Sequence, residues 1–252
     1  MAEAWELSPC IEWLFAEGGR PFAERVARAA ESGFRRVEFW GTQDKELASL
    51  EAAIDDSGVA VSAILSEPAA THPEFLAGVE RSCELARRLD ARNLIVLSGD
   101  ALAGVDTTEQ RDALTDALRR AAPIAARHGI GLVLEPLNTR VDHPDYFLDS
   151  TVDALEVVRA ADHSAVRLLY DLYHSVVMGE EPAVVLAGSG HLVGHVHLAD
   201  APGRHEPGAG EIDWPRQLAA LRDAGYRGAL GLEYMPTTDT AQSLAYIREI
   251  TA

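Results

Sequence analysis

The sequence contains little cysteine, little lysine and little positive charge. Its two cysteines, Cys10 and Cys83, form no close pair, which disfavours both a disulfide framework and a cysteine zinc site. The formal net charge of -18 would repel a phosphate backbone, so neither nucleic acid nor an anionic membrane surface is expected as a partner. The only lysine, Lys45, lies in a polar stretch typical of an exposed helix start. Schiff-base chemistry needs a lysine in an apolar pocket, so an imine-forming aldolase is disfavoured.

Long hydrophobic runs are also lacking. No segment approaches the roughly 18 to 20 apolar residues that a membrane-spanning helix requires. The first six residues, Met1 to Glu6, contain neither a basic stretch nor an apolar run of the kind that begins a secretory signal. These two absences predict a cytoplasmic protein.

Short apolar segments rich in β-branched residues alternate with longer segments of helical periodicity, which is typical of parallel β/α units. A chain of 252 residues with 47% hydrophobic residues also matches the size of one eightfold barrel. We therefore predict an α/β protein with a single (β/α)8 TIM barrel domain over residues 1–252. The eight predicted strands are Trp5–Leu14, Arg36–Phe39, Val59–Leu65, Asn93–Leu97, Gly131–Glu135, Val166–Asp171, Leu192–Leu198 and Ala229–Glu233.

The segments between the strands contain helix signals. Thr107–Gln110 resembles a capping box, and glycine follows several amphipathic segments where a helix would end. A doubly wound sheet is disfavoured because no Gly-x-Gly-x-x-Gly turn follows the first strand. An irregular segment, 199–213, follows the seventh strand on the side where barrel enzymes hold their active sites. The predicted helices include Pro21–Ser32, Pro73–Leu89, Thr108–His128, Thr151–Ala160, Trp214–Ala224 and Thr240–Ile250.

Ligand-type side chains end the last four predicted strands: Glu135, Asp171, His197 and Glu233. In a closed barrel these strand ends converge on one mouth. Three carboxylates in one partly dry site repel one another unless a cation lies between them. Three carboxylate oxygens and one imidazole suit Mn²⁺ or Mg²⁺, with Co²⁺ also possible, better than a structural zinc. We therefore predict that these four residues bind one divalent metal ion.

Other polar and aromatic residues are assigned to the interior of the barrel. The period-two alternation of a strand places His195 on the same face as His197 but one layer deeper, so we interpret it as a hydrogen-bonded histidine of the barrel. Glu38, on the second strand, is interpreted as part of an interior polar network. Candidates for the lining of the mouth near the first two strands are Trp13, Phe39 and Trp40.

Five motifs together resemble a known family. They are Leu134-Glu135-Pro136-Leu137-Asn138, Asp171-Leu172-Tyr173-His174, His195-Val196-His197-Leu198-Ala199-Asp200, Gly203-Arg204-His205-Glu206-Pro207-Gly208 and Gly231-Leu232-Glu233-Tyr234. They resemble the xylose-isomerase-like sugar isomerases and epimerases. Within that superfamily, the Arg204–Pro207 stretch and Asn138–Arg140 are most similar to hydroxypyruvate isomerases. The resemblance implies a TIM barrel enzyme of carbohydrate metabolism that binds metal through the four residues at the strand ends.

The same resemblance implies an isomerase that converts hydroxypyruvate to tartronate semialdehyde through an enediolate. Glu135 and Glu233 would act as the catalytic acid and base as well as metal ligands, and His174 and Arg204 would contact the substrate. A guanidinium group pairs with both oxygens of a carboxylate, so Arg204 suits a substrate that carries one. Glu206 is assigned to the substrate-binding set as the residue that orients Arg204 or His205.

Other functions stay open from the sequence. A ketose 3-epimerase would use the same ligands and glutamates on a longer substrate without a carboxylate. An endonuclease on the same barrel would need more histidine ligands and a basic rim, which the charge of -18 disfavours. A catalytically silent barrel that acts as a binding protein would have the same fold without the reaction. An apolar patch on the outer helices could also serve a homo-oligomer.

Overall fold

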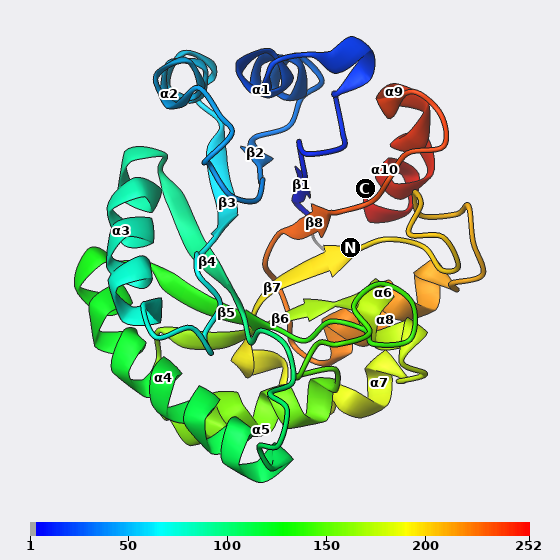
Figure 1. Cartoon of the computed structure of the whole chain (residues 1–252). Helices are drawn as coiled ribbons and strands as arrows, with labels where there is room; N and C mark the ends of the chain where they lie inside the picture. The colour runs from blue at the N-terminus through cyan, green and yellow to red at the C-terminus, as the bar shows by residue number, and fades with distance from the viewer. Residues whose placement is uncertain (1–3) are drawn as a thin grey trace.

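The computed structural model describes residues 4–252, which form an eight-stranded parallel sheet curved into a barrel (Figure 1). Neighbouring strands pair in the order β1-β8-β7-β6-β5-β4-β3-β2. A parallel bridge between Cys10 and Glu38 joins the first strand to the second, so the barrel is nearly closed and the predicted fold is confirmed. The strands are β1 (Leu7–Pro9), β2 (Arg36–Val37), β3 (Ala60–Leu65), β4 (Ala91–Leu97), β5 (Gly131–Glu135), β6 (Val166–Asp171), β7 (Val193–Leu198) and β8 (Leu230–Leu232).

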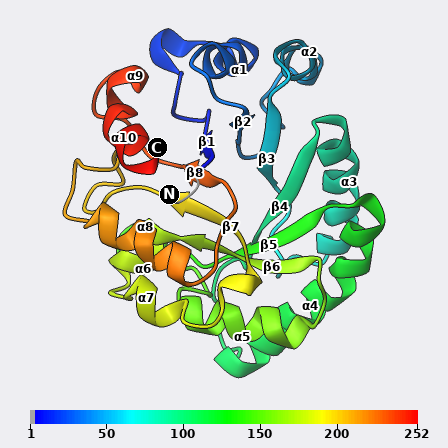
Figure 2. The ribbon, with the colours of Figure 1, turned by 180° about the vertical axis from the view of Figure 1, so that it is seen from behind.

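Helices form a ring outside the strands, as both views show (Figures 1 and 2). Their apolar faces pack inward; α1, for example, buries Val26 and Ala29. Within residues 4–252, no helix is both long enough and apolar enough to cross a membrane. The helices are α1 (Phe22–Glu31), α2 (Leu47–Ser57), α3 (Phe75–Arg88), α4 (Thr107–His128), α5 (Thr151–Ala161), α6 (Leu172–Val177), α7 (Pro182–Val185), α8 (Trp214–Asp223), α9 (Thr240–Ser243) and α10 (Ala245–Thr251), with short 3₁₀ turns η1 (Glu17–Gly19) and η2 (Gly190–Leu192).

The first strand is shorter than predicted. The strand β1 covers only part of the predicted Trp5–Leu14, because the chain turns after Cys10. There the backbone N–H of Ile11 donates to the carbonyl of Glu38 at 2.9 Å, which joins the turn to the second strand. Residues 1–3, which the predicted domain includes, lie outside the described residues, so the domain bounds stay a prediction.

Several helix ends also differ from the prediction. The N-cap of α4 is Asp106, whose carboxylate accepts from the backbone N–H of Thr108, so the predicted capping box at Thr107–Gln110 is wrong. An aspartate at this position satisfies a free N–H of the first turn in the same way. The predicted helix Thr240–Ile250 is two helices, α9 and α10, that meet at Leu244. The helices α2, α6 and α7 were not among those predicted.

The interior of the barrel is layered. One small apolar cluster fills its centre, with Ala63 from β3, Ile95 from β4, Val133 from β5 and Leu169 from β6. Because side chains on one face of a strand recur every second residue, the residues two positions after Val133 and Leu169 lie one layer nearer the carboxyl ends. Those residues are Glu135 and Asp171. The small apolar cluster therefore lies directly below a polar layer at the mouth of the barrel.

Candidate active site

The four predicted ligand residues converge at the mouth of the barrel. Glu135 ends β5, Asp171 ends β6, His197 lies in β7 and Glu233 follows β8. All four side chains are buried, and one ligand atom from each lies within 4.8 Å of those of the others. The Nδ1 atom of His197 is 3.2 Å from Glu135 Oε1, 3.5 Å from Glu233 Oε2 and 4.0 Å from Asp171 Oδ2. The structure thus brings together residues that are far apart in the sequence.

The charges of this cluster perturb one another strongly. Burial raises the pKa of Glu135 to about 7, although a hydrogen bond from His197 opposes the shift. Burial also raises the pKa of Asp171 to about 6, against the attraction of Arg204. For Glu233, burial is outweighed by His197 and Arg204, so its pKa is lowered. For His197, burial is outweighed by Glu233 and Glu38, so its pKa is raised well above the usual value. Such opposed shifts in one place are typical of functional sites.

A divalent metal ion fits this donor set. Three carboxylates and one imidazole are the ligands that Mn²⁺ and Mg²⁺ accept, and their convergence in a buried place needs a compensating positive charge. Two further donors beside the cluster, His174 Nε2 and Arg204 Nε, are buried without a hydrogen-bond partner in the described chain. Buried polar atoms are nearly always bonded, and both of these residues line a cavity, so the two donors are available to a molecule bound there.

A cavity of about 420 Å³ opens beside the cluster. This volume lies within the range of small-molecule pockets. The two tryptophans predicted to line the mouth do so, with ring centroids 5.0 Å apart and edge-to-face packing, whereas Phe39 is buried in the core and was assigned wrongly. The cavity is lined by Trp13, Trp40, Leu65, Ile95, Leu97, Glu135, Leu137, Asp142, His143, His174, Arg204 and Glu233.

Arg204 projects from the loop after β7 into this cavity. Its guanidinium carbon lies 5.3 Å from the ring centroid of Trp13 and 5.4 Å from that of Tyr173, so two aromatic rings hold it. One terminal nitrogen, Nη2, pairs with Glu233 Oε2 and lies 3.8 Å from Asp171 Oδ2. The backbone φ of Arg204 is 56°, a conformation that costs a residue with a side chain about 1–3 kcal/mol. The loop therefore holds this side chain at the cluster despite local strain.

Asp200 organises the loop that carries Arg204. The carboxylate is fully buried and accepts hydrogen bonds from four donors. They are the backbone N–H groups of Ala201, Gly208 and Ile212, at 2.9, 2.7 and 3.1 Å, and the indole N–H of Trp214 at 2.8 Å. A buried carboxylate with this many donors is strongly held, so Asp200 has a structural role in the loop.

His174 presents one defined nitrogen to the cavity. Its Nδ1 atom accepts from the backbone N–H of Asn138 at 3.1 Å, which places the proton of the neutral ring on Nε2. Burial and the nearby Arg204 lower the pKa of His174 well below its usual value, so the ring is neutral. The Nε2 atom lies 3.7 Å from Asp171 Oδ2. His174 is therefore placed to donate to an oxygen of a bound molecule.

Glu206 does not join the site. Its carboxylate accepts from the backbone N–H of Thr237 at 2.9 Å and from the hydroxyl of the same residue, and it does not line the cavity. The loop turns after Arg204, so Glu206 faces the segment that follows β8. His205 likewise lies against the carbonyl of Met235, with Nδ1 at 2.9 Å. Glu206 makes its hydrogen bonds to Thr237, and neither Arg204 nor His205 is hydrogen-bonded to it.

The prediction that Lys45 is an exposed residue is wrong, because its side chain is only 2% exposed. The ammonium group pairs with Glu12 Oε1 at 2.9 Å and lies 4.1 Å from the ring centroid of Phe22. Glu12 Oε1 also accepts from the backbone N–H of Trp40 at 2.8 Å, and the indole of Trp40 donates to Glu233 Oε1 at 2.6 Å. Lys45 thus supports a wall of the site. The sequence did not reveal this role because Glu12 lies far from Lys45 along the chain.

The barrel and its buried cluster define a class of protein. They are typical of TIM barrel proteins with a group of potential metal ligands at the carboxyl ends of the strands. The profile of the xylose isomerase-like TIM barrel family matches residues 26–250. The chain therefore belongs to this family, and the resemblance of its motifs is confirmed.

Named relatives indicate that the chain is an isomerase. A Streptomyces coelicolor protein, provisionally named hydroxypyruvate isomerase, is 34% identical to this chain. The match covers 93% of this chain and 92% of the Streptomyces protein. The hydroxypyruvate isomerase of Escherichia coli is 29% identical, over 94% and 96% of the two chains. A solved structure named AP endonuclease, family 2, from Brucella melitensis superposes with a TM-score of 0.89 at 29% identity, covering 98% and 100% of the two chains.

Proposed function

We propose that the protein is a metal-dependent isomerase that interconverts hydroxypyruvate and tartronate semialdehyde. The observation that supports it best is the convergence of Glu135, Asp171, His197 and Glu233 in one buried cluster, next to a cavity that Arg204 lines. Two relatives that carry this activity in their names, at 34% and 29% identity, support the same substrate. A nuclease function, suggested by the name of the similar Brucella melitensis structure, conflicts with the net charge of -18.

The four residues of the cluster would hold the metal. The donor set favours Mn²⁺ or Mg²⁺, with Co²⁺ also possible. When bound, the ion supplies Lewis-acid stabilisation of the negative charge that develops on the substrate's carbonyl and neighbouring hydroxyl oxygens.

Glu135 and Glu233 would move the proton. Isomerisation removes a proton from C3 of hydroxypyruvate, gives an enediolate, and returns a proton to C2. The two glutamates come from β5 and from the residue after β8, and their oxygens lie 3.2 Å and 3.5 Å from His197 Nδ1. One carboxylate takes the proton from C3, the other, protonated beforehand, returns one to C2, and the proton of the C3 hydroxyl passes to the C2 oxygen. The indole N–H of Trp40 holds Glu233 Oε1, which leaves Oε2 as the oxygen available for proton transfer.

Arg204 would bind the substrate carboxylate. Its Nε atom is buried with no hydrogen-bond partner among residues 4–252, while its Nη2 atom pairs with Glu233 Oε2. A carboxylate that binds the guanidinium fork would satisfy Nε and compete with Glu233 for the nitrogens. Substrate binding would thereby release Glu233 Oε2 to act on the proton. His174 Nε2, which like Arg204 Nη2 lies near Asp171 Oδ2, would donate to another oxygen of the substrate in the same cavity.

A ketose 3-epimerase is the second candidate. The cavity of about 420 Å³ is roomy for a three-carbon acid, and the same ligands and glutamates would serve a longer sugar. Such a substrate carries no carboxylate for Arg204. The role of Arg204 therefore separates the two candidates.

Proton NMR in D₂O tests both candidates in one experiment. Metal-stripped protein reconstituted with Mg²⁺ is given hydroxypyruvate and, separately, a panel of free ketoses, with a chelated sample as control. We expect hydroxypyruvate to be converted with deuterium entering carbon, and conversion to stop on chelation. Exchange at C3 of a ketose alone would instead establish the epimerase. Metal binding without turnover of either class would favour a silent barrel that acts as a binding protein.

A further inference from the structure

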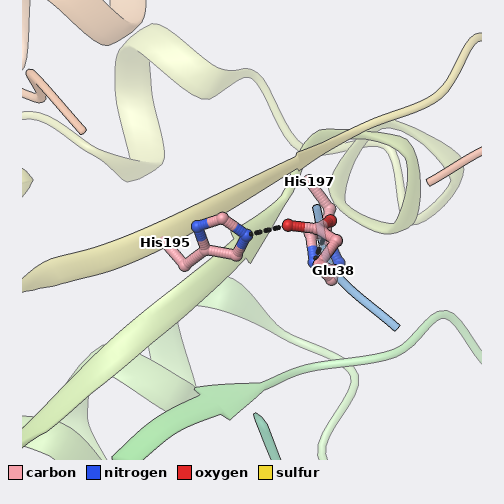
Figure 3. A group of neighbouring side chains, drawn as sticks. All are labelled: Glu38, His195 and His197. Atoms are coloured by element: carbon pink, nitrogen blue, oxygen red, sulfur yellow. Dashed lines mark hydrogen bonds and ion pairs between the residues drawn. The ribbon is translucent and has the colours of Figure 1, made fainter. Parts of the chain in front are cut away.

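A second polar cluster lies below the mouth, inside the barrel. Glu38, His195 and His197 are 1%, 2% and 1% exposed. The carboxylate of Glu38 lies against both imidazoles (Figure 3), with Oε2 2.8 Å from His195 Nε2 and Oε1 3.2 Å from His197 Nε2. The interior network predicted for Glu38 and the hydrogen bond predicted for His195 are confirmed. The proton transfer and substrate binding proposed for the mouth give this cluster no role.

The ring of His197 belongs to both clusters. Its Nδ1 faces Glu135, Asp171 and Glu233, and its Nε2 faces Glu38. Nε2 and Glu38 Oε1 are buried, have no hydrogen-bond partner among the described residues, and lie 3.2 Å apart as an ion pair. Carboxylates face both ring nitrogens, since Nδ1 also lies 3.2 Å from Glu135 Oε1. When Nδ1 gives up its proton, the contact with Glu38, whose ionised carboxylate only accepts, supports the tautomer with the proton on Nε2. In that tautomer Nδ1 carries the lone pair that a metal ligand needs.

We propose that Glu38 is a positioning residue that fixes the tautomer and the orientation of His197 for metal binding. His195 holds the second oxygen of Glu38 and so prevents the carboxylate from rotating away. Partners of this kind orient a ligating histidine and raise its basicity. The inference rests on the proposed function, because it assumes that Nδ1 of His197 is a ligand.

Gly231 leaves the space that this contact needs. The residue lies in β8 and pairs in register with His197 of β7. A Cβ atom at this position would lie 2.3 Å from Glu38 Oε1 and 2.6 Å from His197 Cδ2. Any larger residue would therefore push the carboxylate away from the imidazole. Its backbone is not in the left-handed region, so an alanine suits the strand, and its methyl group would press first on Glu38 and on the ring of His197.

The same three residues could instead hold an ion of their own, since their ligand atoms also lie within 4.8 Å of one another. The separation of 2.8 Å between Glu38 and His195 is that of an ordinary hydrogen bond, which favours the positioning role. The number of ions bound per chain separates the two possibilities.

Calorimetric titration with Mn²⁺ tests the proposal on the full-length, metal-stripped protein. The variants are Glu38→Gln, Gly231→Ala, their combination, and Gly131→Ala as the matched control. The control puts the same methyl group on a strand glycine whose nearest neighbour is also a polar side-chain atom, Asn93 Oδ1 at 2.6 Å, at the far end of the barrel. Circular dichroism checks that each variant is folded, and Gly231→Ala keeps the test valid if Glu38→Gln does not fold.

We expect wild type and Gly131→Ala to bind one Mn²⁺ per chain with similar affinity. Glu38→Gln and Gly231→Ala should each weaken binding by about 10–100-fold. The combined variant should be no weaker than the worse single one, because both act on one contact. Nitrogen NMR of the Mg²⁺-loaded wild type, labelled at histidine, should show the proton of His197 on Nε2.

Wild-type affinity in Glu38→Gln and Gly231→Ala would overturn the proposal and leave the proposed function intact. Additive losses in the combined variant, a proton on Nδ1, or a second ion per wild-type chain would overturn it too. A wild-type protein that binds no Mn²⁺ would contradict the proposed metal site itself, a result distinct from the others.

Discussion

The two ends of the barrel contain hollows of similar size but of different chemistry. At the amino ends of the strands, a cavity of about 440 Å³ is lined by exposed arginines, among them Arg167 and Arg227, which donate to backbone carbonyls. At the carboxyl ends, the cavity of about 420 Å³ borders carboxylates that are almost fully buried. Volume therefore does not distinguish the two ends. The buried carboxylates of the cluster, which outnumber the cations beside them, do distinguish the ends, and they support a functional site at the mouth.

Removal of either proposed proton carrier should have the largest effect. Replacement of Glu135 or Glu233 by Gln keeps the shape of the side chain but removes its ability to take a proton. Turnover of hydroxypyruvate should fall by about 10² to 10⁴-fold in each variant. NMR assays give the rates, and a Mn²⁺ titration of each variant separates lost proton transfer from lost metal. Glu109→Gln, the same change at an exposed site on α4, is the control.

Arg204→Met should have the next largest effect. Loss of a charge-assisted, two-pronged contact to the substrate carboxylate should lower kcat/KM for hydroxypyruvate on the order of 10²-fold, mainly through KM. Arg204→Lys should recover part of the loss, because it keeps the charge without the fork. Steady-state kinetics at saturating Mg²⁺ measure both. An unchanged KM in Arg204→Met would remove this residue from substrate binding and strengthen the epimerase candidate.

Lys45→Met should have a smaller effect on turnover and a clear effect on stability. The variant removes the ion-pair partner of Glu12, whose side chain is 11% exposed and has Arg25 as a second nearby cation, so the free energy of unfolding should fall by about 1–3 kcal/mol. Movement of Glu12 would shift Trp40 and weaken the hydrogen bond from its indole to Glu233 Oε1. This shift should slow turnover on the order of tenfold. Urea denaturation and kinetics measure the two effects. The double variant Lys45→Met/Glu12→Gln should regain stability, and a double variant as unstable as the single would contradict the proposed support.

Substitutions in the cavity at the amino ends of the strands should have the smallest effect on turnover and stability. Arg167→Gln and Arg227→Gln alter exposed side chains that contact carbonyl oxygens, so stability should change by less than about 0.5 kcal/mol. Turnover should stay at the wild-type level. Thermal denaturation and the NMR assay provide the check. A large loss of turnover in either variant would erase the distinction between the two ends.

The barrel and the convergence at its mouth could be predicted because both follow from local patterns. Alternating apolar strands and amphipathic helices predict parallel β/α units, and each of the four ligand residues lies at the carboxyl end of a predicted strand, as Glu135 does in β5. Strand periodicity also placed His195 one layer below His197. These features depend on residues that are close in the sequence.

Features that depend on distant pairs could not be predicted. Lys45 resembled a surface residue because neither Glu12 nor the ring of Phe22 is near it in the sequence. Glu206 adjoins Arg204 along the chain, yet the loop turns it toward Thr237. The space left by Gly231 is visible only when β8 is paired with β7 and Glu38 reaches across the barrel. Burial and loop direction are properties of the folded chain, so sequence patterns did not reveal them.

The most direct test of the metal site is anomalous diffraction from crystals of the protein soaked in Mn²⁺. We predict one strong peak per chain, about 2.0–2.3 Å from ligand atoms of Glu135, Asp171, His197 Nδ1 and Glu233. The peak should be lost on chelation. A protein without a peak, or with its only peak between Glu38, His195 and His197, would contradict the proposed metal site at the mouth.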